Sequence, residues 1–240
     1  MQTTSGRDYP SEYAEIDDFG GFDIDRQVHD VAAVEPTLRF PARIGLARID
    51  TGDLAAIPAE EAEAWAASAE RLGPTFGEFV PVNRLVVDML APPLAGLHSR
   101  ADYARQVIEK IRLGAARQHL DAVLIYQTHG TGSIRDNGFA MADWTVVGAF
   151  LLPGRSVDAA VYGTALLVDV RNGYPYGSAD TLVERSTLTP ARSASSTMSR
   201  VDDEARTAAV LALVGDVERM MLQLKEELEG IAAAEGDWAF

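Results

Sequence analysis

The feature that most constrains the fold is a long stripe of apolar residues at helical spacing near the carboxyl end of the chain. The stripe lies between Val201 and Glu229, and acidic residues stand near its start, where the positive end of a helix favours them. Its apolar members are Val210, Leu213, Val214, Val217, Met221, Leu224 and Leu228. An apolar face of this length must cover a sheet or a partner helix.

Strands that such a helix would cover are indicated upstream of it. Asp121–Gln127 is a continuous apolar run, which is typical of a strand buried on both faces. Three further β-rich segments follow, at Trp144–Leu152, Val157–Val170 and Tyr176–Leu188. The turn at 171–173 contains Asn-Gly, the pair that tight hairpins favour, so the later strands are predicted to be antiparallel.

Earlier segments predict an alternation of strands and helices. Ala42–Ile49 and Phe79–Val82 indicate strands, Pro58–Leu72 and Asp102–Leu120 indicate helices, and residues 84–98 fit either. The order predicts an α/β (α+β) fold: a two-layer domain with a mixed, partly antiparallel sheet and a long C-terminal helix. The order of the strands in the sheet does not follow from the sequence.

Charge and turn residues divide the chain into three parts. Residues 1–40 hold nine acids and three arginines, and we predict an extended acidic N-terminal arm or tether there. Residues 41–230 form a single α/β domain in this interpretation, with a loop at Pro190–Ser199. Gly230 is expected to end the last helix, which leaves 231–240 as a C-terminal tail.

Composition excludes several classes of function. The chain carries 36 acidic and 21 basic residues, a net charge of −15, which disfavours binding to nucleic acid or to anionic lipid. It has no cysteine, so disulfides, thiol catalysis, iron–sulfur clusters and thiolate zinc sites are ruled out. We expect no cofactor, and no segment is apolar for long enough to span a bilayer.

The segment after the central strand is the candidate ligand site. In open α/β sheets, ligands bind beyond the carboxyl ends of strands, and there His129 would act as a base while glycines admit a phosphate. The candidate residues are His129, Gly130, Gly132, Arg135, Asp136 and Asn137. A phosphate site needs a helix directly after the glycines, whereas this segment leads into another strand. A hairpin connection is therefore the favoured interpretation, and a ligand loop is the alternative.

Other polar residues give weaker indications of chemistry. The four histidines are not spaced as metal ligands, the acids between Glu15 and Asp30 do not follow a calcium-loop register, and no Gly-x-Ser-x-Gly motif is present. We therefore predict no metal site, and the catalytic residues stay unknown. Asp169 lies in an otherwise apolar strand and is expected to bind the amides of the following turn, a structural role.

Four stretches of the chain, Pro41–Ala47, Asp121–Tyr126, Trp144–Phe150 and Leu167–Gly173, together resemble the rhombotarget lipoproteins, a bacterial cell-envelope family of undefined biochemical role. The last stretch is also similar to envelope lipoproteins of the curli-secretion type. The resemblance covers roughly residues 40–228 and lies in strands, not in catalytic signatures. It implies a non-enzymatic envelope domain for binding or assembly, in the periplasm and held by a lipid anchor whose cysteine is absent from this chain.

Two interpretations of the location and two of the partners stay open. The first six residues have neither a basic start nor an apolar run. This fits a cytoplasmic protein. It also fits a polar tether in which Met1 stands in the place of a lipidated cysteine. The alternative function is a soluble enzyme or small-ligand binder that uses the loop around His129. Partners are expected to be other proteins or further copies of this chain. They would bind at a sheet edge, Tyr176–Leu188 or Trp144–Leu152, or at the helix 201–229. The alternative is a monomer whose arm covers the edge.

Overall fold

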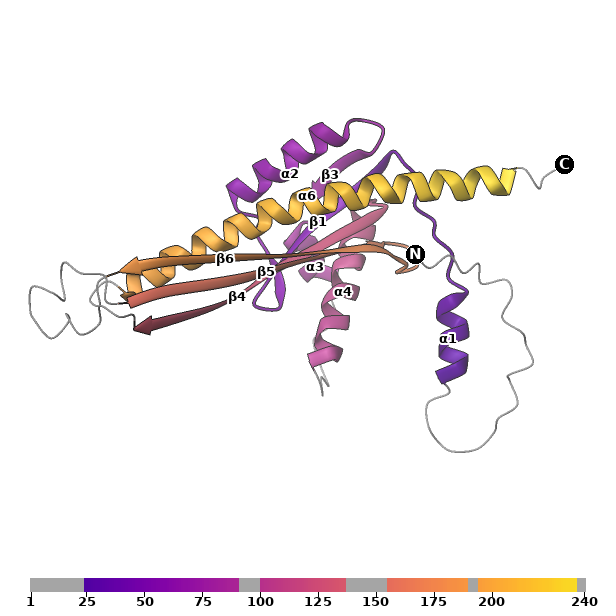
Figure 1. Ribbon diagram of the computed structural model, residues 1–240. Coiled ribbons are helices and arrows are strands. Elements are labelled where there is room, and N and C mark those ends of the chain that lie inside the picture. The colour runs from indigo at the N-terminus through magenta and orange to yellow at the C-terminus, as the bar shows by residue number, and fades with distance from the viewer. Residues whose placement is uncertain (1–23, 91–99, 137–154, 190–193, 237–240) are drawn as a thin grey trace, which may run out of the picture. The chain divides into compact units, whose positions relative to one another are not determined.

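The computed structural model describes residues 24–90, 100–136, 155–189 and 194–236 (Figure 1). Its contacts divide the chain into Met1–Thr37 and Leu38–Phe240. The first part contains helix α1 (Ile24–Ala32), in which no residue is buried. The whole sheet and the other helices belong to the second part.

Helix α1 corrects the prediction of an extended arm over part of its length. Ile24, Val28 and Val31 recur at a spacing of four and three residues and form one exposed apolar stripe. That periodicity is a helix signal, although the acidic composition of residues 1–40 obscured it. The aromatic residues of the arm between Tyr9 and Phe22 lie outside the described residues.

The sheet is mixed, as predicted. Its strands are β1 (Ala42–Asp50), β2 (Asp53–Ala55), β3 (Gly77–Pro81), β4 (Ala122–Asp136), β5 (Arg155–Asp169) and β6 (Pro175–Thr189). The order is β2-β1-β4-β5-β6, and β3 also pairs with β1. β1 runs parallel to β3 and β4, whereas β4, β5 and β6 form a long antiparallel meander. This arrangement confirms the α/β class with later strands that are antiparallel.

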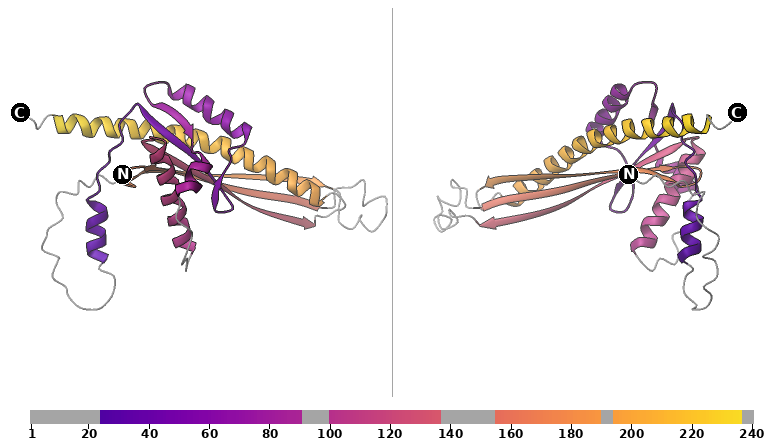
Figure 2. Two further views of the ribbon diagram at one scale, coloured as in Figure 1. Left: turned by 180° about the vertical axis from the view of Figure 1, so that it is seen from behind. Right: turned by 45° about the vertical axis from the view of Figure 1, so that its right-hand side comes forward.

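Helices lie on both faces of the sheet, which corrects the predicted two-layer arrangement. They are α2 (Ala59–Leu72), α3 (Arg84–Leu90), α4 (Arg100–Arg117) and α6 (Ala194–Gly236). α2 and α6 lie on one face, and α3 and α4 lie on the other (Figures 1 and 2). The apolar core on the α3–α4 side gathers around Val87, Ile111 and Val123 and involves only the first residues of β4.

Helix α6 confirms the packing predicted from the apolar stripe. Val210, Val217 and Leu224 are buried against the sheet and α2, together with Leu213 and Met221. The helix is longer than expected, because it begins at Ala194, inside the predicted loop, and continues past Gly230 to Gly236. Ser and Thr are tolerated in a first helical turn, and the alanines that follow position 230 favour continuation. Residues 84–90, which fitted either structure, form α3.

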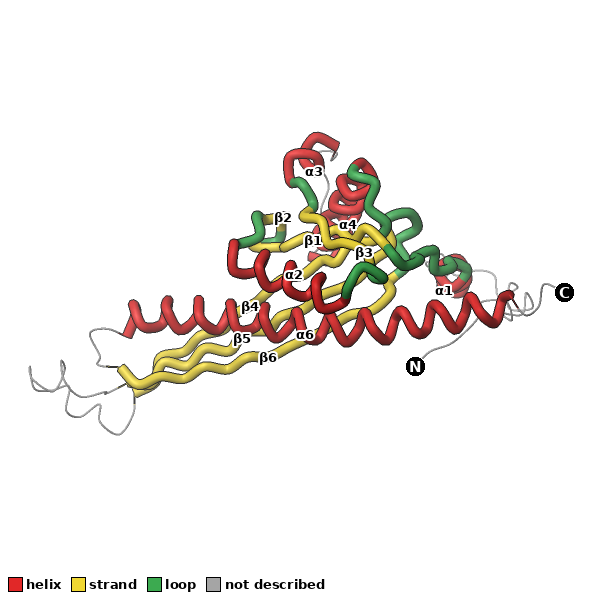
Figure 3. Tube along the Cα trace, turned by 90° about the horizontal axis from the view of Figure 1, so that it is seen from above, coloured by secondary structure: helices red, strands yellow, loops and turns green. Residues whose placement is uncertain are grey.

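The meander extends well beyond β1. β1 pairs with β4 only from Ala122 to Gln127, whereas β4 continues to Asp136. We call the remaining part of the meander the sheet extension; it comprises β4 Thr128–Asp136, β5 Arg155–Gly163 and β6 Thr181–Thr189 (Figure 3). The amino-terminal part of α6 packs on one face of the extension. Its residues Val201, Ala205 and Ala209 are buried in one apolar cluster with Val157 and Val161 of β5. Among the described residues, the extension therefore consists of one layer of strands and one layer of helix.

Candidate functional site

The predicted ligand loop is a strand. His129, Gly130 and Gly132 lie within β4, as does the backbone of Arg135 and Asp136, and each pairs with a residue of β5. The pairing is continuous from Ala122 with Asp169 to Asp136 with Arg155. Glycine disfavours strands, but the β5 ladder and α6 supply the partners that override this preference. Asn137 lies outside the described residues, as does the predicted strand Trp144–Leu152.

The two glycines of this strand face α6. A Cβ atom added at Gly130 would lie 2.7 Å from Oδ1 of Asp202, and one added at Gly132 would lie 2.7 Å from Sδ of Met198. The missing side chains therefore allow the helix to lie close to the sheet. This close approach explains the glycines without a phosphate, which is a role that the sequence motif did not indicate.

His129 faces the opposite side of the sheet. It pairs with Tyr162 of β5, which in turn pairs with Leu182 of β6, so the three residues form a row across the strands. All three are exposed, Tyr162 to 50% and Leu182 to 48%. The structure thus separates the side chain of His129 from the surfaces at Gly130 and Gly132, instead of bringing them to one site.

The outer edge of β4 is the most distinctive surface of the extension. From Thr128 to Asp136, β4 is paired with β5 on one side, and no described strand pairs with it on the other. An unpaired strand edge presents a row of backbone N–H and C=O groups that a further strand can bind. We call this stretch the β4 edge.

The two edges of the described sheet differ in charge. The exposed residues of β6, the last strand, include Asp180, Glu184 and Arg185. Charged side chains on an edge strand hinder unwanted pairing. Thr128–Ser133 of the β4 edge contains no Asp, Glu, Lys or Arg, and His129 is its one titratable residue. The charged residues of the β4 edge, Arg135 and Asp136, stand at its end, which leaves Thr128–Ser133 as an uncharged stretch that an added strand can pair with.

A polar cluster lies on the other half of the sheet, beneath α2. Glu61 is buried and accepts a hydrogen bond of 2.9 Å from Oη of Tyr126, while Nε of Arg48 lies 3.2 Å from its Oε2 atom. Burial, and secondly the neighbouring charge of Glu61, raise the pKa of Tyr126. The phenol therefore stays protonated and donates to the carboxylate, which ties α2 to β1 and β4. The sequence placed Tyr126 in an apolar strand and Glu61 in a first helical turn, without a signal that they meet.

Asp169 has the structural role that was predicted. Its side chain is 1% exposed, and Oδ1 accepts hydrogen bonds from the backbone N–H groups of Arg171 and Asn172, at 2.7 and 3.2 Å. Oδ2 accepts a bond of 2.6 Å from Oη of Tyr176, whose oxygen accepts one from the N–H of Leu38. The carboxylate thus fixes the β5–β6 turn and, through Tyr176, the start of the second part of the chain.

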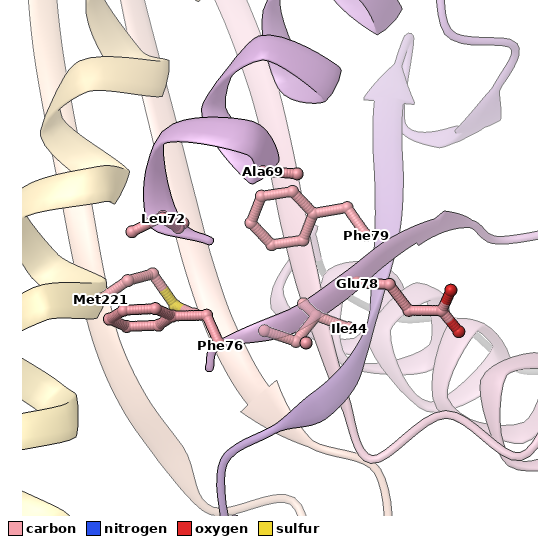
Figure 4. Close-up of a pocket in the computed structure, with 8 residues that line it drawn as sticks. Ile44, Ala69, Leu72, Phe76, Glu78, Phe79 and Met221 are labelled. Carbon is pink, nitrogen blue, oxygen red and sulfur yellow. The ribbon is translucent and has the colours of Figure 1, made fainter. Parts of the chain in front are cut away.

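A small cavity lies away from the predicted ligand residues. Its volume is about 10 Å³, and its lining includes Ile44, Leu72, Phe76, Phe79 and Met221 (Figure 4). A space of this size holds roughly one water molecule. The cavity is therefore a packing gap between α2, α6 and the sheet.

Neither a metal site nor a membrane-spanning helix is found in the described residues. They contain no group of three or more His, Asp or Glu residues placed to hold a metal ion. Within the same ranges, every helix is too short or too polar to cross a membrane.

Comparisons with known proteins leave the family open. No family model matches the chain, and no curated protein does. Lipoprotein GNA1162 from Neisseria meningitidis is similar at 18% identity, over 68% of this chain and 97% of that one, with a TM-score of 0.31. A minor lipoprotein from Acinetobacter baumannii is similar at 9% identity, over 75% of this chain and 90% of that one, with a TM-score of 0.35. These neighbours are lipoproteins, but at such TM-scores the likeness carries no argument about this chain.

Proposed function

We propose that this chain is a non-enzymatic protein-binding domain of the bacterial cell envelope, and that the β4 edge is its binding surface. The observation that carries the proposal is the unequal pairing of β4, which is bound on both sides up to Gln127 and on one side beyond it among the described residues. Strand addition at such an edge gives affinity through backbone hydrogen bonds, and side chains give specificity.

The open face of the extension adds the side-chain contribution. Tyr162 and Leu182 place an aromatic ring and an aliphatic group beside each other on the face that α6 leaves uncovered, with His129 in the same row. Aromatic residues are enriched where proteins bind proteins. A strand added at the β4 edge would set its own side chains next to His129, so that this row would continue into the partner.

The envelope location rests on the sequence resemblance to the rhombotarget lipoproteins. In this proposal, a lipid anchor precedes the acidic arm, and the domain of residues 41–230 is held in the periplasm. Cell fractionation of the native bacterium tests this part. We expect the protein in the membrane fraction, released by detergent and not by high salt; recovery in the cytosolic fraction would refute it.

Site-directed photo-crosslinking in living cells tests the binding surface. A benzophenone amino acid at Thr131, an exposed residue of the β4 edge, is expected to give a discrete crosslinked protein band. The same probe at Glu63, on the exposed side of α2, is the matched control and is expected to give none. Equal crosslinking from both positions, or none from Thr131, would contradict a specific role for this edge.

A further inference from the structure

We infer that the β4 edge binds the segment Trp144–Leu152 of a second copy of this chain. The inference rests on the proposed function and names its partner. It follows from three observations: the length of the free edge, the one predicted strand that the described sheet does not contain, and the short connection between that strand and β5.

The donor is identified by elimination. Each strand that the sequence predicts corresponds to one of β1, β3, β4, β5 and β6, except Trp144–Leu152. That segment has nine residues and no charged side chain, and the free stretch of β4, Thr128–Asp136, also has nine residues. An apolar segment with high strand propensity needs cover, and an edge of equal length supplies the missing backbone partners.

The segment cannot pair over its full length with the edge of its own chain in the antiparallel direction. Full pairing would place Leu152 opposite Thr128. Thr128 is eight residues from Asp136 at the end of β4, so Leu152 would lie about 27 Å from that end. Arg155 is held opposite Asp136 at that end. Three peptide links separate Leu152 from Arg155 and reach at most about 11 Å.

The parallel direction is excluded for its own chain by a similar argument. Trp144 would then lie opposite Thr128. The eight peptide links between Asp136 and Trp144 would have to run about 27 Å back along β4. Eight fully extended residues span at most about 29 Å, which leaves about 2 Å for the reversal of direction and for the sideways step of about 4.8 Å to the next strand position. A second copy has neither restriction.

The charges of the two surfaces agree with this pairing. Copies with a net charge of −15 repel each other over most of their surfaces. Over the inferred contact, Thr128–Asp136 with Trp144–Leu152, the one acidic residue is Asp136 and Arg135 stands beside it, so the repulsion is weakest where the contact forms. β6, with Asp180 and Glu184 exposed, lacks this property.

Disulfide trapping tests the inference directly, because the chain has no cysteine of its own. Purified Thr131→Cys protein is mixed with Val147→Cys protein, or with Ala149→Cys protein, and oxidised. Pairing in full register places residue 131 beside residue 147 in the parallel direction and beside residue 149 in the antiparallel direction. We expect a disulfide-linked dimer in one of these mixtures, since neighbouring strands bring Cα atoms within disulfide range.

The control is Ser178→Cys, at an exposed position of β6, mixed with the same two variants. It is expected to give at least tenfold less dimer. Light scattering of the unmodified protein should give twice the mass of 25.8 kDa as its concentration rises. A monomer at all concentrations without a trapped dimer would overturn the inference.

Further outcomes separate this inference from the proposed function. A disulfide formed within one chain of the Thr131→Cys, Ala149→Cys double variant, with monomeric mass, would show that the segment covers its own edge and would overturn the second-copy contact. Flotation of the monomer with neutral phosphatidylcholine vesicles, lost on Phe150→Asp, would identify a membrane contact instead. Photo-crosslinks from Thr131 to a different protein, without trapped dimer, would uphold the proposed function and refute this inference.

Discussion

At the scale of single residues, the buried carboxylate of Asp169 shows how one side chain organises a turn. It accepts two backbone N–H groups and the hydroxyl of Tyr176, all within 3.2 Å. Asp169→Ala removes this shared acceptor, so three hydrogen bonds are lost at a residue that is 1% exposed.

We therefore expect Asp169→Ala to lower the free energy of unfolding by about 2–4 kcal/mol in urea denaturation. Tyr176→Phe removes one of these three bonds and also the bond that the hydroxyl accepts from the N–H of Leu38, so it should destabilise the fold as well. Asp180→Ala, an exposed acid on β6, is the matched control and should change stability by less than about 0.5 kcal/mol. Equal effects at Asp169 and Asp180 would show that the turn does not depend on this carboxylate.

The ion pair between Arg71 of α2 and Glu218 of α6 predicts a dependence of stability on pH. Hydrogen bonding from Arg71 lowers the pKa of Glu218. A carboxyl whose pKa is lower in the folded state stabilises the fold above its unfolded pKa, about 4.3, and loses this contribution as pH falls through the folded value. Glu218→Gln should therefore be less stable than the unmodified protein at pH 7, and the difference should vanish near pH 2. A difference that is the same at both pH values would contradict the linkage.

At the scale of elements, α6 carries two surfaces of opposite character. Leu213 is fully buried against the sheet, whereas Leu211, two residues earlier, is 53% exposed. Leu213→Ala leaves a cavity and should cost about 2–5 kcal/mol. Leu211→Ala makes the same chemical change on the solvent side and should cost less than about 1 kcal/mol. Thermal or urea denaturation of the two variants measures the contrast, and similar losses would mean that α6 is not packed as described.

Local pattern was sufficient for most elements and insufficient for the ends of β4 and α6. The apolar run at Asp121–Gln127 predicted the half of β4 that is covered on both faces, because burial leaves an apolar signature. Thr128–Asp136 carries no such signature, since its strand structure depends on pairing with β5 and on α6 above Gly130. The role of Gly130 and Gly132 was hidden for the same reason: a glycine that admits a helix and one that admits a phosphate look identical in sequence. Long-range pairing decides between them.

At the scale of the whole molecule, the net charge of −15 governs how copies meet. Salt screens repulsion between charges farther apart than a Debye length, about 10 Å at 0.1 M and about 3 Å at 1 M. If copies associate through the neutral β4 edge, raising sodium chloride from about 0.05 M to about 0.5 M should strengthen association. Sedimentation equilibrium at both concentrations measures the change, and weaker association in high salt would show that ion pairs hold the contact.

The N–H of Leu38 donates a hydrogen bond to Tyr176, and β1 starts four residues later. This arrangement determines how the domain would bear tension. A pull on the amino-terminal arm enters the fold along β1. β1 lies parallel to β4 from Ile44–Ala122 to Ile49–Gln127, so a domain held at its β4 edge would load this ladder in shear. In shear, all of the hydrogen bonds share the force at once, whereas peeling breaks them one after another. A pull on the arm would thus load the β1–β4 ladder in shear instead of peeling it apart.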